Sequence, residues 1–198
     1  MATTPQVPIF PLNTVLFPGG LLPLRVFEAR YMDMAREALK QGTPFGVCLI
    51  REGQEVGAPA VPSPVGTLAR ILDCDMQQMG VLLLRTLGTE RFRIRTSRVS
   101  GQGLIVADID RLAEPADTTL PSQYGACERL LRAVAASQPT PIFEEPLQFD
   151  SARWVSNRLS EVLPLPLSVK QSLLEVDDSL VRLGVLFNFM QQRGLILN

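Results

Sequence analysis

The chain contains no histidine among its 198 residues. Histidine is the commonest general base near neutral pH and a frequent zinc ligand, so its absence excludes Ser-His and Cys-His nucleophile pairs and most zinc sites. The three cysteines, Cys48, Cys74 and Cys127, stand far apart in the sequence and form no Cys-x-x-Cys pair. A zinc clip or a thioredoxin-like redox site is therefore not expected, and the thiols are predicted to be buried spectators.

Lysine is also scarce, and Lys40 and Lys170 are the two examples. Neither follows a glycine, so neither is the phosphate-binding lysine of a P-loop, Gly-x-x-x-x-Gly-Lys-Ser/Thr, and nucleotide hydrolysis is not expected. A Ser-Lys dyad of Lys170 with Ser168 or Ser172 needs a desolvated lysine. Lys170 lies in a polar, helix-like stretch and is predicted to be solvated.

The paired acids offer weak evidence for acid and base catalysis or for a cation site. Asp177 and Asp178 precede an apolar-periodic run, which predicts that one of them caps the last helix. Glu144 and Glu145 stand beside Pro146 and are predicted to lie in a solvated loop. The sequence therefore predicts no enzyme activity, no catalytic residue, no metal site and no cofactor.

Charge and hydropathy exclude further classes of protein. The formal net charge is −1 and the isoelectric point about 5.6, so no global field attracts nucleic acid or an anionic membrane. No apolar run approaches the roughly 20 residues that span a bilayer, and the N-terminus lacks the features of a signal peptide. With an odd number of cysteines, the expected compartment is the cytoplasm, without a membrane partner. The hydrophobic content of 46% predicts a folded globule.

The first 42 residues show clear patterns of apolar residues that predict secondary structure. Three short, proline-bounded apolar runs at 7–10, 14–17 and 21–26 predict strands joined by tight turns. Four residues then recur at spacings of four, three and four, which predicts one buried face of a helix that Gly42 ends. These residues are Phe27, Tyr31, Met34 and Ala38.

The same segment closely resembles the N-terminal substrate-binding domain of Lon proteases. The resemblance is carried by Phe10-Pro11-Leu12, Leu16-Phe17-Pro18-Gly19, Leu22-Pro23-Leu24-Arg25-Val26-Phe27-Glu28 and Arg30-Tyr31. Later landmarks are Gly66-Thr67-Leu68-Ala69-Arg70-Ile71, Glu90-Arg91-Phe92-Arg93-Ile94, Leu163-Pro164-Leu165 and Lys170-Gln171-Ser172-Leu173-Leu174-Glu175. The chain has Ala29 where the family often has proline, and alanine is equally acceptable in a first helical turn. The resemblance covers nearly the whole chain.

Two domains are expected, in an α+β arrangement. An apolar run at 45–50 is followed by a proline-rich loop at 56–65 and by strands at 68–74, 81–87, 90–99 and 104–109, which predict an antiparallel meander. With the N-terminal strands and the packed helix, these form a small barrel over residues 1–115. The family resemblance implies the same fold, a PUA-like β-domain.

The composition changes near 113–121, where proline, aspartate and threonine become frequent, and this change indicates the boundary between the domains. Residues 116–198 are predicted to form a C-terminal helical bundle of four helices. The apolar residues that indicate the helices are Leu130, Leu131 and Val134, then Trp154, Leu159, Val162 and Leu163, then Val169, Leu173 and Leu174, then Leu180, Leu183, Phe187 and Met190.

The resemblance implies a non-catalytic module of protein quality control that captures unfolded or damaged polypeptides. Because the sequence shows neither the ATPase nor the protease module of a Lon protease, we expect a stand-alone form, with a separate ATPase or protease as a further partner. A peptide could add to an uncovered edge of the sheet or place apolar side chains in a groove between the two domains. The candidate peptide-binding residues are Arg25, Phe27, Glu28, Arg30 and Tyr31. Structural ion pairing is the alternative role for the charged members of this set, and the favoured one.

Binding of RNA is the alternative function. Arg91, Arg93 and Arg95 alternate with apolar residues, so that a regular strand would present three guanidinium groups on one face. PUA-like folds in other families bind RNA, and arginines on a sheet can contact phosphates. The acidic isoelectric point and the aromatic content of 6% place nucleic acid second as a partner.

Overall fold

Strand β1 (Gln6–Leu12) begins the part of the chain that the computed structural model describes, residues 6–196. Its side chains alternate between two hydrophobic clusters. Phe10 and Leu12 pack in a cluster with residues of helix α1 (Ala29–Gln41), whereas Val7 and Ile9 pack in a second cluster of strand residues. Because both faces of β1 are buried, its sequence is almost continuously apolar rather than alternating with polar residues.

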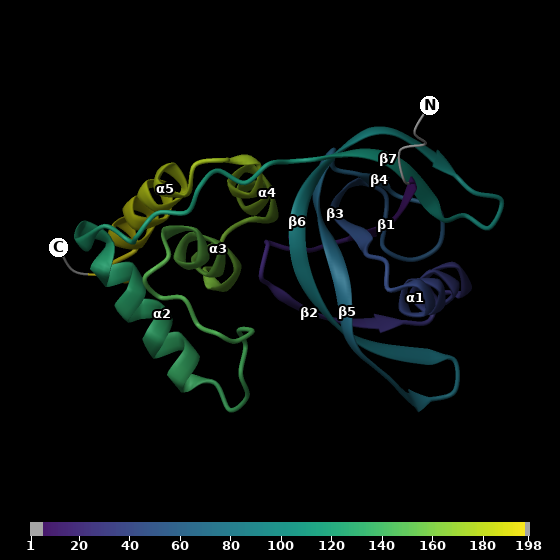
Figure 1. Cartoon of the computed structure of the whole chain (residues 1–198), viewed down its shortest axis with the longest axis horizontal. Coiled ribbons are helices and arrows are strands. Elements are labelled where there is room, and N and C mark those ends of the chain that lie inside the picture. The colour runs from purple at the N-terminus through teal and green to yellow at the C-terminus, as the bar shows by residue number, and fades with distance from the viewer. Residues whose placement is uncertain (1–5, 197–198) are drawn as a thin grey trace. The chain divides into compact units, whose positions relative to one another are not determined.

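The remaining strands are β2 (Leu21–Val26), β3 (Phe45–Glu52), β4 (Val61–Pro62), β5 (Val65–Gln78), β6 (Val81–Val99) and β7 (Ile105–Arg111). All of their pairings are antiparallel except that of β1 with β3. The hydrogen-bonded path runs from β1 through β7, β6, β5 and β3 and returns to β1, while β2 pairs with β6 (Figure 1). The mixed α and β class and the antiparallel character of the sheet are confirmed, with one parallel pair that the sequence did not predict.

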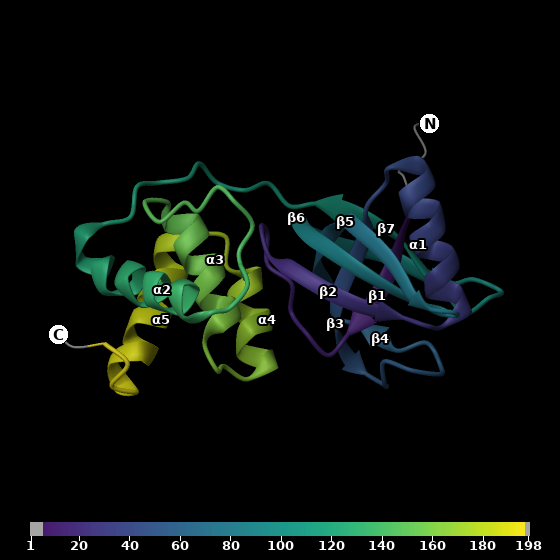
Figure 2. The same ribbon diagram turned by 90° about the horizontal axis from the view of Figure 1, so that it is seen from below.

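The chain divides into two compact units, Met1–Ala113 and Glu114–Asn198, which we call unit 1 and unit 2. Unit 1 contains all the strands and helix α1 (Ala29–Gln41). Unit 2 contains a short 3-10 helix (Ser122–Tyr124) and the helices α2 (Gly125–Ser137), α3 (Ala152–Val162), α4 (Leu167–Glu175) and α5 (Ser179–Gln192). Helix α3 contacts α2, α4 and α5 (Figure 2). In the described part of the chain, no helix is long and apolar enough to cross a bilayer.

The segment 14–17 is a buried loop, and the prediction of a strand there is wrong. Val15, Leu16 and Phe17 are all buried, but residues 14–17 pair with no strand in the described part of the chain. Its backbone groups form hydrogen bonds outside any strand pairing. The Leu16 carbonyl accepts a 2.6 Å bond from Thr67 Oγ1, and Gly19 N, just after the segment, donates to the Gly88 carbonyl at 2.8 Å. Such bonds through distant residues leave no local signal in the sequence.

Strand β6 is one continuous strand, where the sequence predicted two strands separated near Gly88. A Cβ atom at Gly88 would lie 2.4 Å from the Phe17 carbonyl oxygen, so glycine is needed there for the close approach of the 14–17 loop. The glycine marks a contact rather than a turn. The predicted loop at 56–65 likewise contains the short strand β4.

Helix α1 has the predicted buried face, with Tyr31, Met34 and Ala38 each less than 7% exposed. Gly42 ends the helix in the left-handed conformation, at φ 65°, as predicted. Phe27 does not belong to this face: it precedes the helix and is 51% exposed. The spacing of four from Tyr31 is coincidental because the backbone is still extended at Glu28.

All four helices predicted for the C-terminal part are present, and α5 is capped by Asp178. The Asp178 carboxylate accepts bonds from the backbone N–H groups of Leu180, at 2.7 Å, and Val181. We expect Asp178→Ala to lower the free energy of unfolding by about 1 kcal/mol, because the variant leaves these N–H groups without their cap. Urea unfolding, followed by fluorescence of Trp154 in unit 2, measures this loss. Asp178→Asn is the control, since asparagine caps equally well and should be nearly neutral.

Candidate functional site

Arg30, in the first turn of α1, ties three segments of unit 1 together. Its guanidinium pairs with Glu28 at 2.9 Å and donates to the carbonyl oxygens of Gly57, at 2.7 Å, and Gly103, at 3.0 Å. The side chain is only 7% exposed, and its buried Nε has no hydrogen-bond partner among residues 6–196. The ion pairing that the sequence favoured for Glu28 and Arg30 is present, and it fixes two loops against the helix.

Tyr31 lies in the core beside this ion pair. Its ring stacks on Phe10, with 4.0 Å between the ring centroids, and the Arg30 guanidinium lies 4.8 Å from the Tyr31 centroid. Burial raises the pKa of the Tyr31 phenol, and the charge of Arg30 opposes that rise. Tyr31 therefore anchors α1 to β1 and offers little surface to a partner.

Arg25 and Phe27 are the exposed members of the candidate peptide-binding set. Arg25 lies on β2, opposite Leu83 of β6, and Phe27 follows the end of that strand. The structure therefore joins Glu28, Arg30 and Tyr31 in one buried cluster and leaves Arg25 and Phe27 on the surface. Contact of these five residues with a peptide stays a prediction.

A cleft of about 990 Å³ lies beside α1 and is lined only by residues of unit 1. We call it the α1 cleft. Its apolar floor is built from buried or partly buried side chains, and its rim from exposed polar ones. The floor comprises Val7, Pro8, Met34, Ala38, Pro44, Leu68, Leu104 and Ile109; the rim comprises Gln6, Asp33, Glu37, Gln41, Thr43, Gln102 and Arg111; and Arg30 stands between them.

The α1 cleft has the size and character of a binding site. An apolar concavity of several hundred cubic ångström with a few polar groups at its edge is typical of sites that bind small molecules or peptide side chains. The sequence did not predict this candidate site, because its lining comes from α1, β1, β5, β7 and the 43–44 and 102–104 segments, which only the tertiary fold brings together. The one local signal was the apolar face of α1, which includes Met34 and Ala38.

The open edges of the sheet are poorly suited to receive an added strand. Among the described residues, β2 pairs only with β6, and so does β5 beyond Ala69. Pro23 removes a backbone donor from the middle of β2. In β5 the register shifts between Ile71 and Asp73, and the Asp73 carboxylate accepts a bond from Cys74 N at 3.0 Å. Prolines, bulges and charges of this kind protect edges against further pairing, so the α1 cleft is the better candidate for a peptide-binding site.

The three arginines of the alternative nucleic-acid surface are not equivalent. Arg91 is buried, at 1% exposure, whereas Arg93 and Arg95 are exposed. The register shifts between Ile94 and Thr96, so the regular alternation that the prediction assumed ends at Arg95. Arg95 forms an ion pair with Asp110 at 3.3 Å. Because Arg91 is buried and Arg95 is paired with an acid, the basic surface is weaker than the sequence pattern indicated.

The residues considered for catalysis make structural contacts. Burial raises the pKa of the Cys127 thiol to about 11 and also raises the pKa of Cys48, as expected for spectators, although Cys74 is only partly buried. Lys170 is not the solvated residue that we expected: its Nζ donates to the Glu161 carbonyl at 2.6 Å, and burial lowers its pKa. The Ser172 hydroxyl donates to the Ser168 carbonyl. In residues 6–196, no group of three or more Cys, Asp or Glu side chains could hold a metal ion.

Comparison with solved structures agrees with this fold. A crystal structure of a Lon N-terminal domain protein from Xanthomonas campestris is 39% identical, with a TM-score of 0.77, and the match covers 93% of this chain and 98% of that one. The N-terminal domain of a Mycobacterium avium complex Lon protease has the same fold, at 18% identity and a TM-score of 0.66, with 94% and 98% of the two chains covered.

A curated relative points the same way. The Lon protease of Cytophaga hutchinsonii is 26% identical over 94% of this chain, which corresponds to 24% of that protein. The chain thus spans about a quarter of the length of this relative. The family model of the ATP-dependent protease La (LON) substrate-binding domain matches residues 6–192. The match of almost every described residue to this model shows that the chain belongs to the LON substrate-binding domain family.

Proposed function

We propose that this protein is a non-catalytic module that binds segments of unfolded or damaged polypeptide, and that they bind in the α1 cleft. The observation that carries the proposal is the apolar floor of the cleft, edged by polar side chains. An apolar side chain of a bound segment would leave water at the floor, and the rim would hydrogen-bond the backbone on either side. Membership of a substrate-binding family supports the role.

The proposal extends to the partners and the architecture of the protein. Apolar segments are exposed in unfolded chains and buried in native ones, so a cleft that selects them would serve protein quality control, with a separate ATPase or protease receiving the captured chain. We further infer that the closed path of strands in unit 1 is the PUA-like barrel and that the helices of unit 2 form a bundle domain.

A paired substitution on α1 tests the site. Gln41 lines the cleft, whereas Leu39 is 46% exposed on the same helix and does not line it. We expect Gln41→Trp to fill part of the cleft and weaken binding of an unfolded model polypeptide about tenfold, which corresponds to about 1.4 kcal/mol. Leu39→Trp adds the same indole outside the cleft and should leave the affinity nearly unchanged.

Fluorescence anisotropy of a labelled, permanently unfolded polypeptide measures both affinities, and circular dichroism establishes that both variants are folded. Equal affinity of the wild-type protein and Gln41→Trp would place the bound segment elsewhere. Equal weakening by both substitutions would show that the added indole, and not its position in the α1 cleft, is responsible.

A further inference from the structure

Among the described residues, one charged side chain of the α1 cleft lies in no ion pair. Four charged side chains line the cleft, and three of them lie in ion pairs. These pairs are Arg30 with Glu28 at 2.9 Å, Asp33 with Arg36 at 2.9 Å, and Arg111 with Glu90 at 2.7 Å. The fourth is Glu37, which forms no ion pair with a described residue. Its carboxylate accepts a hydrogen bond from the neutral amide of Gln41.

The carboxylate of Glu37 lies close to the apolar floor of the α1 cleft. Glu37 is exposed and lies one residue before Ala38 and three after Met34, both of which are floor residues. Residues three apart on a helix are neighbours on its surface, so the carboxylate stands at the rim directly beside apolar side chains. A ligand whose apolar group occupies the floor would bring its next residue near Glu37.

We propose that Glu37 makes the α1 cleft selective for polypeptide segments in which a cationic group adjoins an apolar residue. The cationic group is the side chain of lysine or arginine or the N-terminal ammonium of the bound chain. Electrostatic complementarity of this kind contributes to specificity more than to affinity. This selectivity rests on the proposed binding of polypeptide in the α1 cleft and adds the class of segment that binds best.

The magnitude of the selectivity follows from the exposure of the rim. An exposed ion pair contributes about 0.2–1 kcal/mol, which is up to about fivefold in affinity. The preference is therefore modest and depends on salt, since the Debye length is about 10 Å at 0.1 M and about 3 Å at 1 M. Binding at the apolar floor does not share this dependence.

The proposal is tested with three short peptides that share the same apolar core. They differ in the residue beside it, which is lysine, glutamine or glutamate. All are N-acetylated and C-amidated, and a fourth, with glutamine and a free N-terminus, tests whether a terminal ammonium replaces the lysine. We expect the lysine peptide to bind the wild-type protein about three- to fivefold more tightly than the acetylated glutamine peptide. The glutamate peptide should bind most weakly.

Substitution of Glu37 should remove this order. In Glu37→Gln the lysine and glutamine peptides are expected to bind equally, and in Glu37→Lys the glutamate peptide should bind best. Glu175→Gln is the matched control, because Glu175 is exposed in α4 and bonded to Gln171 one helical turn away, as Glu37 is to Gln41. This control should keep the wild-type order of affinities.

The outcomes separate this selectivity from the proposed function. Equal binding of the acetylated peptides to the wild-type protein, or a lysine preference that survives in Glu37→Gln, would overturn the selectivity while polypeptide binding stands. Failure of every peptide to bind, in a protein that circular dichroism shows to be folded, would overturn both. A lysine preference that is lost in Glu37→Gln and kept in Glu175→Gln supports the proposal.

Discussion

Replacing Arg182 with methionine is expected to lower the free energy of unfolding of unit 2 by about 3–5 kcal/mol. Arg182 lies on α5 and is 2% exposed, and its guanidinium bonds to groups on two other segments. Methionine has a similar length and no donors, so the substitution removes every hydrogen bond of this buried guanidinium, and breaking a buried hydrogen-bond network is among the changes with the largest losses of stability. Native domains are stable by about 5–15 kcal/mol in total, so such a loss would remove a large part of the stability of this unit.

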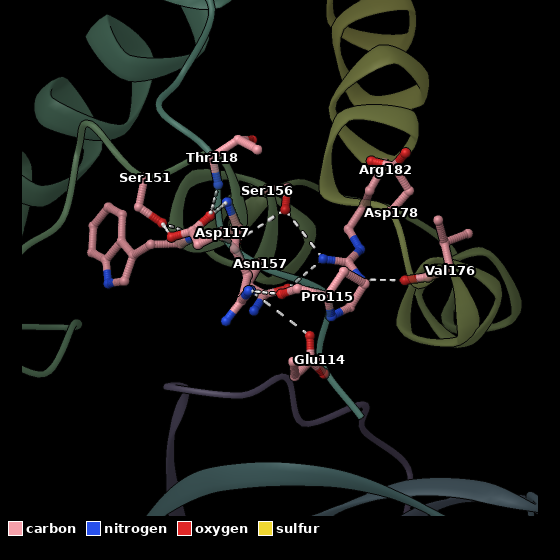
Figure 3. Close-up of polar contacts among 12 residues, drawn as sticks. Glu114, Pro115, Asp117, Thr118, Ser151, Ser156, Asn157, Val176, Asp178 and Arg182 are labelled. Carbon is pink, nitrogen blue, oxygen red and sulfur yellow. Dashed lines mark hydrogen bonds and ion pairs between the residues drawn. The ribbon is translucent and has the colours of Figure 1, made fainter. Parts of the chain in front are cut away.

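The bonds of Arg182 explain why one side chain has this effect (Figure 3). Its Nε donates to the Leu173 carbonyl at 2.9 Å, and Nη2 donates to the Val176 carbonyl, at the end of α4. Nη1 donates to Asn157 Oδ1 at 2.7 Å and to Ser156 Oγ at 3.1 Å, both on α3. The planar guanidinium thus joins α3, α4 and α5 at one point, and a lysine with its single nitrogen could not replace it.

The fluorescence of Trp154 reports the unfolding of unit 2, because it is the only tryptophan in the chain. Its indole lies edge-on against Phe143 and Phe149, with centroids 5.4 and 5.0 Å away, and loses this environment on unfolding. The urea midpoint of Arg182→Met should fall steeply. Arg193→Met, at an exposed arginine at the end of the same helix, should be nearly silent. A shift of the same small size in both variants would contradict the role given to Arg182.

Gly66→Ala is expected to have the second large effect, a loss of about 3 kcal/mol in unit 1. A Cβ atom at Gly66 would lie 2.4 Å from the Val47 carbonyl oxygen, 2.5 Å from Cys48 Sγ and 3.0 Å from the Phe92 ring. The first of these atoms belongs to the backbone of β3, so the strands themselves must move apart. Overpacking of a core commonly costs about 1–3 kcal/mol, and a clash with backbone falls at the upper end.

Urea unfolding of unit 1, followed by the NMR amide signals of β3 and β5 in the whole chain, measures the effect of Gly66→Ala. Gly101→Ala is the control, since a Cβ at Gly101 meets no atom of the described residues within 4 Å and its φ is not positive. The two variants replace the same residue type and should differ by several kcal/mol. Similar stability of the two would show that the strands around Gly66 yield easily.

The sequence predicted well those elements whose signal is local. Helix α5 was predicted with its cap because both the apolar spacing and the Asp178 carboxylate act within one helical turn. Helix α1 was predicted for the same reason, except for Phe27, where the spacing continued by coincidence beyond the helix. Gly42 also acted locally, through its left-handed backbone.

Features that depend on distant segments could not be predicted in this way. Residues 14–17 resemble a strand, but the Leu16 carbonyl bonds to Thr67 and the nearby Gly19 N–H bonds to Gly88, both far along the chain. The burial of Arg91 and the register shift after Ile94 are likewise set by the neighbouring strands. The α1 cleft is a consequence of the assembled sheet and helix, so the family resemblance indicated a substrate-binding role but not the cleft that we propose as the site.

The most direct test of the account is a titration of the whole chain with an uncharged, permanently unfolded polypeptide and, separately, with a short single-stranded RNA, each at low and high salt. We predict that the polypeptide binds with an affinity that changes little with salt, since its apolar side chains enter the α1 cleft. Phosphate contacts would instead lose affinity steeply as salt rises. Salt-sensitive binding of the RNA alone, without binding of the polypeptide, would contradict the account.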